Sequence, residues 1–257
     1  MSQTFQYDNS HTDYLASRCP KMAMAIETIG HIDRPVNPDI FSELIRAIIG
    51  QQISSSAAHT VWQRLMNLTD ITPTAIANLS PDDLQGVGIS YRKVGYIQGI
   101  ACDILDNQLD LDSLHTMSDD EIKQVLVAFK GVGEWTAQML MIFSLNRMDV
   151  LSQHDLAIVR GLRMLYRHRE ITPKFFAKYQ RRFAPYNSVA SLYLWAIAGG
   201  ALGLSDPKPT LKKPNLNCHH QLNLLQCTLC NMKKCYALCS WQVCQTITEA
   251  DLSTSSG

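Results

Sequence analysis

The stretch LVAFKGVGEWTAQMLMIFSLNRMDVLSQHD, residues 126–155, decides the fold of this chain. Just upstream, Ser118 and Glu121 have the spacing of a capping box, which predicts the start of a helix. Helical spacing of apolar residues runs up to Gly131 and Gly133, which allow a tight turn without a Cβ penalty. The same spacing resumes after the second glycine, so we predict two helices joined by a hairpin.

The hairpin has a possible ligand. Backbone N–H groups at the start of its second helix point outward, and such a helix end attracts anions, a nucleic-acid phosphate among them. The alternative is a helical hairpin that closes on its glycines and binds nothing. The hairpin by itself does not decide between the two.

Composition fits a soluble globular protein of one or two domains, with 257 residues, 46% hydrophobic and 18% charged. The formal net charge is zero, so DNA binding would require a local basic patch. Segment 160–182 is one candidate, since it has a single acid, Glu170, and the alternative is a solvated helix face. Its basic residues are Arg160, Arg163, Arg167, Arg169, Lys174, Lys178, Arg181 and Arg182.

Targeting signals are lacking in this sequence. Apolar runs fall short of the roughly 20 residues that a membrane span needs, and residues 1–14 have no basic-then-apolar signal pattern. We therefore expect a cytoplasmic protein without membrane contact, associated with the nucleoid if the source is bacterial. We also expect a monomer.

Helical periodicity recurs along most of the chain, and no segment of alternating β-branched residues is convincing, so we predict an all-α fold. A second Gly-Val-Gly, at 86–88, faintly echoes the hairpin between a short capped helix and a longer one. Prolines at 207, 209 and 214 predict a linker over 205–217. The other expected helices cover about 13–29, 41–49, 54–66, 91–105, 156–168, 173–183 and 185–202.

Three separated stretches together resemble one family. GQQISSSAAHTVWQRL (50–65), FKGVGEWTAQML (129–140) and SQHDLAIVRGL (152–162) are similar to the helix-hairpin-helix DNA glycosylases, especially the 3-methyladenine DNA glycosylase II branch. The resemblance implies one glycosylase domain over 1–204, built as two helical lobes with DNA between them. Lobe one would comprise about 36–150, and lobe two about 15–35 plus 151–204.

The resemblance makes Asp155 the catalytic residue. Cleavage of an N-glycosidic bond builds positive charge on the sugar, and a carboxylate placed nearby stabilises that charge and can orient or deprotonate water. The alternative is that Asp155 is the N-cap of the helix that follows, and both roles can coexist. A carboxylate sealed in the interior, or turned away from the groove between the lobes, would overturn the enzymatic interpretation.

Trp135 predicts the reaction subtype. Family members that also cut the DNA strand carry a lysine there, which attacks the sugar and forms a Schiff base, and tryptophan cannot do this. The resemblance also places Trp135, Trp195 and Met139 at the base pocket, where electron-rich rings would favour a cationic lesion such as 3-methyladenine. For each tryptophan the alternative is a plain core residue, and methionine at 139, an aromatic in one relative, leaves the lesion range open.

Other positions are expected to touch DNA. Gln52 resembles the glutamine that fills the gap left by a flipped base, the alternative being a buried cap near Gly50. Ile89 or Ser90 is expected to be a second residue that inserts into the DNA beside the flipped base. The remaining contacts expected with the DNA backbone come from Gly131, Gly133 and Thr136, together with a monovalent cation on hairpin carbonyls.

Six of the eight cysteines lie between 218 and 244, which in a reducing compartment indicates metal more than disulfides. Related glycosylases carry a [4Fe–4S] loop with Cys-x6-Cys-x2-Cys-x5-Cys spacing, whereas this chain has x8, x2 and x4. Structural zinc is the other choice, and no metal is the third. The candidate ligands in this cysteine-rich tail, 218–257, are Cys218, Cys227, Cys230, Cys235 and Cys239.

These features predict a monofunctional glycosylase that flips alkylated purines out of damaged duplex DNA and hydrolyses their N-glycosidic bonds, with no cofactor in the chemistry. One alternative is a helix-hairpin-helix DNA-binding module without turnover. Another is a glycosylase for deaminated bases such as uracil or hypoxanthine.

Overall fold

The computed structural model describes residues 3–108 and 110–207. This part of the chain is largely helical. Its helices are α1 (Asn9–Arg18), α2 (Pro20–Ile29), α3 (Ile40–Gly50), α4 (Ser55–Leu68), α5 (Pro73–Asn78), α6 (Pro81–Gly86), α7 (Tyr91–Leu105), the 3-10 helix η1 (Asp112–His115), α8 (Asp119–Ala128), α9 (Glu134–Phe143), α10 (Leu156–Tyr166), α11 (Pro173–Phe183) and α12 (Asn187–Ala198), and its strands are β1 (Gln3–Thr4) and β2 (Pro35–Val36).

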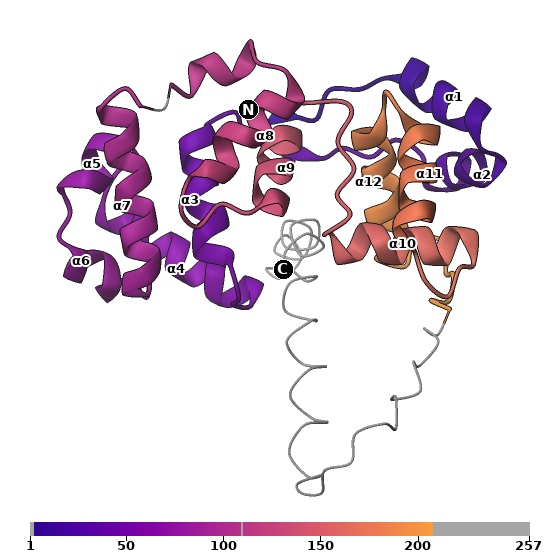
Figure 1. Ribbon diagram of the computed structural model, residues 1–257. Coiled ribbons are helices and arrows are strands. Elements are labelled where there is room, and N and C mark those ends of the chain that lie inside the picture. The colour runs from indigo at the N-terminus through magenta and orange to yellow at the C-terminus, as the bar shows by residue number, and fades with distance from the viewer. Residues whose placement is uncertain (1–2, 109, 208–257) are drawn as a thin grey trace, which may run out of the picture.

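The helices gather in two groups. Figure 1 shows α3 to α9 on one side and α10 to α12 on the other, where α1 and α2 join them from the beginning of the chain. In the second group α10 packs against α12, and α2 contacts both. Gly161 allows this close packing, because a Cβ there would meet the backbone of Leu194.

The predicted hairpin is present. Ser118 and Glu121 form the capping box of α8, with the Ser118 hydroxyl donating to the Glu121 carboxylate at 2.6 Å. The second helix, α9, packs against α3, and its residues Ala137 and Ile142 are completely buried. The buried face of α9 therefore fixes the hairpin to the core of the first group.

One expectation about the N-terminal region was wrong. The helix expected over about 13–29 is two helices, because Pro20 disfavours a helical conformation at Cys19, which is extended. The described fold is largely helical, as expected, with one short addition: residues 3–4 pair antiparallel with Val36 and Pro35 in a two-stranded sheet. The pairing joins segments some thirty residues apart, and nothing in the local pattern of either segment indicates it.

The predicted linker and tail fall mostly outside the described residues. Residues 205–207 are described, and Asp206 accepts a hydrogen bond from Arg163 Nε at 2.9 Å, which fixes this end of the chain to α10. The five candidate metal-binding cysteines, Cys218 to Cys239, lie outside the described residues. Over the described ranges, no helix is both long enough and apolar enough to cross a membrane.

Candidate functional site

The hairpin turn leaves a helix end without a side-chain cap. Gly131 has φ +91°, which favours glycine, and a Cβ on it would lie 2.8 Å from Tyr96 Cγ. Gly133 is the N-cap of α9 and has no side chain to offer, so the first N–H groups of the helix have no side-chain acceptor. Such a helix end can attract an anion, and this geometry fits equally well a hairpin that binds nothing. Thr136 is buried, with 3% of its surface exposed, so its predicted contact with DNA is not supported in this conformation.

A second loop is tied to the hairpin. Gln51 Nε2 donates to the Gly131 carbonyl at 2.8 Å, and Lys93 Nζ donates to the carbonyls of Ile49 and Gln51 at 2.8 and 2.7 Å. Partial burial, with the nearby charge of Arg92, lowers the pKa of Lys93. Sequence reasoning missed Gln51 and Lys93, because side-chain bonds to distant carbonyls leave no periodic signal.

The structure separates the predicted wedge residues. Gln52 is exposed and has φ +61°, so its side chain is available to a ligand, and the buried-cap alternative is wrong for it. Gln51, its neighbour, makes the inward contact instead. Ile89 is only 2% exposed, whereas Ser90 is exposed at the start of α7. Of that pair, Ser90 alone can reach DNA in this conformation.

Asp155 is buried, with 4% of its surface exposed. Its Oδ1 accepts from the backbone N–H groups of Ala157 and Ile158, both at 2.9 Å, so it is the N-cap of α10. The same oxygen accepts from the Trp195 indole at 3.1 Å, and Oδ2 accepts from the Trp135 indole at 2.9 Å. All four partners are donors, which suits an ionised carboxylate, an acceptor only. The N-cap interpretation is thus confirmed.

The two indoles come from different elements. Trp135 lies in the first turn of α9 and is half-buried, while Trp195 is buried in α12. Met139, one turn beyond Trp135 on α9, is also buried. One turn further, Phe143 packs its ring 5.4 Å from that of Trp195, centroid to centroid. Phe143 continues the i, i+4, i+8 row of Trp135 and Met139, a signal that could have identified it.

Burial of Asp155, at 4% exposure, is the arrangement that counts against an enzymatic role. From this conformation a sugar can approach the carboxylate only if a side chain that covers it moves. Trp135 is the more exposed of the two and makes the only side-chain bond to Oδ2 among the described residues. Movement of Trp135 would therefore open the carboxylate and leave the N-cap bonds on Oδ1 in place.

Metal-binding residues do not gather in this region. Among residues 3–108 and 110–207, no group of three or more His, Cys, Asp or Glu side chains could hold a metal ion. The described cysteines are Cys19, which is buried, and Cys102, which is exposed. The zinc and iron–sulfur hypotheses concern the tail alone and stay predictions.

Comparison with known proteins decides the family. A model described as HhH-GPD superfamily base excision DNA repair protein matches residues 45–185. The chain belongs to this superfamily. It is 34% identical over 161 residues to DNA-3-methyladenine glycosylase 1 of Schizosaccharomyces pombe, covering 60% of this chain and 71% of the relative.

Solved structures agree with the HhH-GPD assignment. The crystal structure of a DNA-3-methyladenine glycosidase from Bacillus halodurans matches with a TM-score of 0.70 and 33% identity, covering 77% of this chain and 93% of that one. The 3-methyladenine DNA glycosylase of S. pombe, solved with abasic DNA, matches with a TM-score of 0.66 and 28% identity, covering 74% and 97%. The chain therefore has the helix-hairpin-helix glycosylase fold and is related to 3-methyladenine DNA glycosylases.

Proposed function

We propose that this protein is a monofunctional DNA glycosylase that removes alkylated purines of the 3-methyladenine type from duplex DNA in base-excision repair. The observation that carries the proposal is the environment of Asp155. Its carboxylate lies between the indoles of Trp135 and Trp195, two residues that the family resemblance places at the base pocket. The similar proteins described above are a DNA-3-methyladenine glycosylase and a DNA-3-methyladenine glycosidase, which supports alkylated purines as the substrate class.

Recognition would begin at the backbone. The open N–H groups at the start of α9 hold a phosphate, and the exposed Gln52 enters the gap that the flipped nucleotide leaves. Flipping costs a few kcal/mol, and less for a damaged base whose pairing is already weak. A cationic lesion gains a further contact with the electron-rich indole faces. Damaged bases are thus favoured by the lower cost of flipping and, where they are cationic, by the contact with the indole faces.

Bond cleavage would use Asp155. As the purine leaves with the electron pair of the glycosidic bond, the sugar acquires positive charge, and the carboxylate stabilises it over a short distance. Water then adds to the anomeric carbon and loses a proton to the carboxylate or to solvent, which leaves a hydroxyl at the abasic site. This requires Trp135 to release Oδ2, so the arriving base replaces the indole beside the carboxylate. The two backbone bonds to Oδ1 keep the side chain oriented during the step. The burial of Asp155 is therefore caused in part by the pocket's own aromatic wall.

Strand cleavage is not part of the proposed reaction. An amine nucleophile is required to form a Schiff base with the sugar, and Trp135 supplies none. The product would be a free base and an intact strand with an abasic site. An assay of purified protein for β-elimination products should find none.

The decisive experiment uses Asp155→Asn. Asparagine is as good an N-cap as aspartate, so α10 keeps its cap while the negative charge is lost. Wild-type protein is incubated with methylated, deaminated and oxidised duplexes, and the freed bases are separated by chromatography. We expect release of 3-methyladenine by wild type, and at least about 100-fold slower release by the variant with unchanged DNA affinity. Equal rates for the two proteins would refute the role of Asp155.

One observation favours a second candidate, a DNA-binding module without turnover. The Asp155 carboxylate is buried, and both of its oxygens already have donors in this conformation. If Trp135 never releases it, the protein binds DNA and releases no base. Wild-type protein that binds duplexes but frees no base from any of the three sets would establish this second candidate in place of the first.

A further inference from the structure

The structure divides the basic segment 160–182 in two. Its first part is partly neutralised, because Arg163 forms an ion pair with Asp206 and Arg160 Nε lies 3.5 Å from the same carboxylate. Its last part, on α11, has no such partner. Lys178 and Arg181 are exposed and form no ion pair with any carboxylate that the structure describes.

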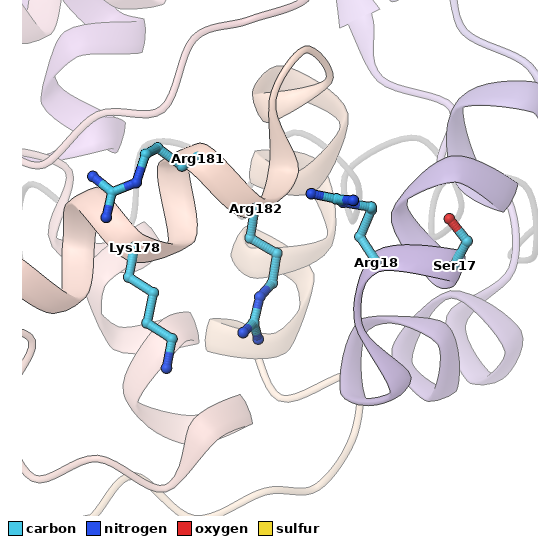
Figure 2. A pocket seen from close by; sticks show the side chains of 5 residues that line it. All are labelled: Ser17, Arg18, Lys178, Arg181 and Arg182. Atoms are coloured by element: carbon cyan, nitrogen blue, oxygen red, sulfur yellow. The ribbon is translucent and has the colours of Figure 1, made fainter.

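These cations face a further one from the beginning of the chain. Arg18, in the last turn of α1, lines a cavity of about 430 Å³ together with Ser17 and three residues of α11, Lys178, Arg181 and Arg182. Figure 2 shows the Arg18 and Arg182 side chains reaching into the space between the two helices, with Lys178 and Arg181 further along α11. No acidic residue lines this α1–α11 basic pocket.

The pocket is held in shape by its neighbours. Tyr14 on α1 donates to the Ala184 carbonyl just beyond α11, at 2.8 Å. The Arg182 guanidinium stacks over Tyr179 and lies 3.9 Å from Cys19 Sγ. Arg18 lies over the Tyr14 ring. Two of the four cations, Arg18 and Arg182, are thus held by aromatic neighbours on either side of the pocket, and an anion between them would reduce the repulsion among the four.

We propose that the α1–α11 basic pocket binds backbone phosphates of duplex DNA on one arm beside the lesion. The proposal rests on the proposed function only in taking duplex DNA as the partner. The chain has no net charge, so its attraction to DNA depends on local clusters such as this one. A row of phosphates fits better than one small anion, because the cations are spread along α11 and across to α1.

The length of α10 gives the scale of the separation between Asp155 and the pocket. Helix α10 has 11 residues and begins next to Asp155, so it is about 16 Å long. At its far end Tyr166 Oη lies 3.1 Å from Cys19 Sγ, and Cys19 follows Arg18 in the chain. With about 3.4 Å of rise per base pair, one helix length corresponds to about five base pairs. We expect the contacted phosphates at about that separation from the flipped nucleotide.

The test removes three exposed charges, in the triple variant Arg18→Gln, Lys178→Gln, Arg181→Gln. Affinity for a lesion duplex of about 30 base pairs is measured over a range of salt concentrations. Each phosphate contact adds about 0.9 to the slope of log K against log salt, so the variant should lose up to about 2.7 of that slope. On a lesion duplex with about four base pairs on each side, too short to reach the pocket, binding and base release should match wild type.

A matched control removes three charges from the same basic segment outside the pocket, in the variant Arg167→Gln, Arg169→Gln, Lys174→Gln. These residues are exposed too, so the change in net charge is equal. The proposal is overturned if both triple variants lose the same slope, or if the pocket variant loses as much affinity for the short duplex as for the long one. Unchanged release of base from the short duplex keeps this outcome separate from failure of the proposed function.

Discussion

Two turns of this molecule share the letters Gly-Val-Gly and differ in structure. At 86–88 and at 131–133 the central valine is buried, with exposed fractions of 8% for Val87 and 6% for Val132. The glycine in the left-handed region is the last of the three in the first turn, Gly88 with φ +109°, and the first of the three in the second. The glycine with positive φ therefore stands two positions earlier in the second motif than in the first.

The difference changes what can cap the helix that follows each turn. In the first turn the next helix begins after Ser90, whose hydroxyl is in place to cap it but makes no cap hydrogen bond. In the second turn Gly133 itself is the N-cap, so no side chain is present at that position. The comparison teaches that the position of a glycine motif relative to the following helix decides whether a side chain can compete with an anion there. The letters alone do not define the site.

The largest effect is expected for Gly131→Ala. Alanine at φ +91° is strained, and its Cβ would overlap the Tyr96 ring, so either the turn or the ring must move. We expect a loss of about 3 kcal/mol in the free energy of unfolding. Urea denaturation of purified protein, followed by circular dichroism, measures it.

Gly133→Ala is the control for that prediction. Its φ of −92° suits any residue, and nothing lies within 4 Å of the added Cβ. The loss should stay below about 1 kcal/mol, the usual difference between glycine and alanine at an N-cap. Equal losses at 131 and 133 would contradict the assignment of the left-handed position to Gly131.

A smaller loss is expected for Gly88→Ala in the first turn. The backbone is again in the left-handed region, but the one tight contact of the new Cβ would be with Val61 Cγ2, at 3.1 Å, which can shift, while Arg64 Nη1 at 3.9 Å is in ordinary contact. We expect about 1–2 kcal/mol, nearly all of it from backbone strain. Adding Val61→Ala should not recover the free energy of unfolding that Gly88→Ala loses. Full recovery in that pair, measured by a double-mutant cycle, would show that side-chain crowding was the cause.

Much of this arrangement was predictable from the sequence, because it depends on local rules. Apolar spacing predicted α8, α9 and α10, and residues such as Ser118 with Glu121 marked a helix start. The N-cap role of Asp155 followed from the same reasoning. Family resemblance brought Trp135 and Trp195 to one place, which no spacing rule could do, since they lie 60 residues apart.

What the sequence could not predict depends on contacts between distant segments. The Gln51 bond to the hairpin, the ion pairs of Asp206 and the arrival of Arg18 beside α11 each join elements whose mutual position only the fold sets. Whether a side chain is buried also depends on contacts between distant segments. Ile89 was a candidate for DNA contact by its place in a turn, yet its side chain faces the core. Nothing in the neighbouring residues distinguishes it from an exposed wedge.

The smallest expected change in the free energy of unfolding, for Gly86→Ala, has the opposite sign. It is the sharpest test of the difference between the two Gly-Val-Gly turns. Gly86 occupies the place in its motif that Gly131 occupies in the other, but it ends α6 in helical conformation with nothing within 4 Å of an added Cβ. Gly86→Ala should therefore stabilise the protein by about 0.5 kcal/mol, since alanine loses less backbone entropy on folding. The same substitution at the same letter would then stabilise one turn and destabilise the other. If Gly86→Ala destabilises in urea as Gly131→Ala does, the two turns share one conformation after all, and the echo in the sequence is a true structural repeat.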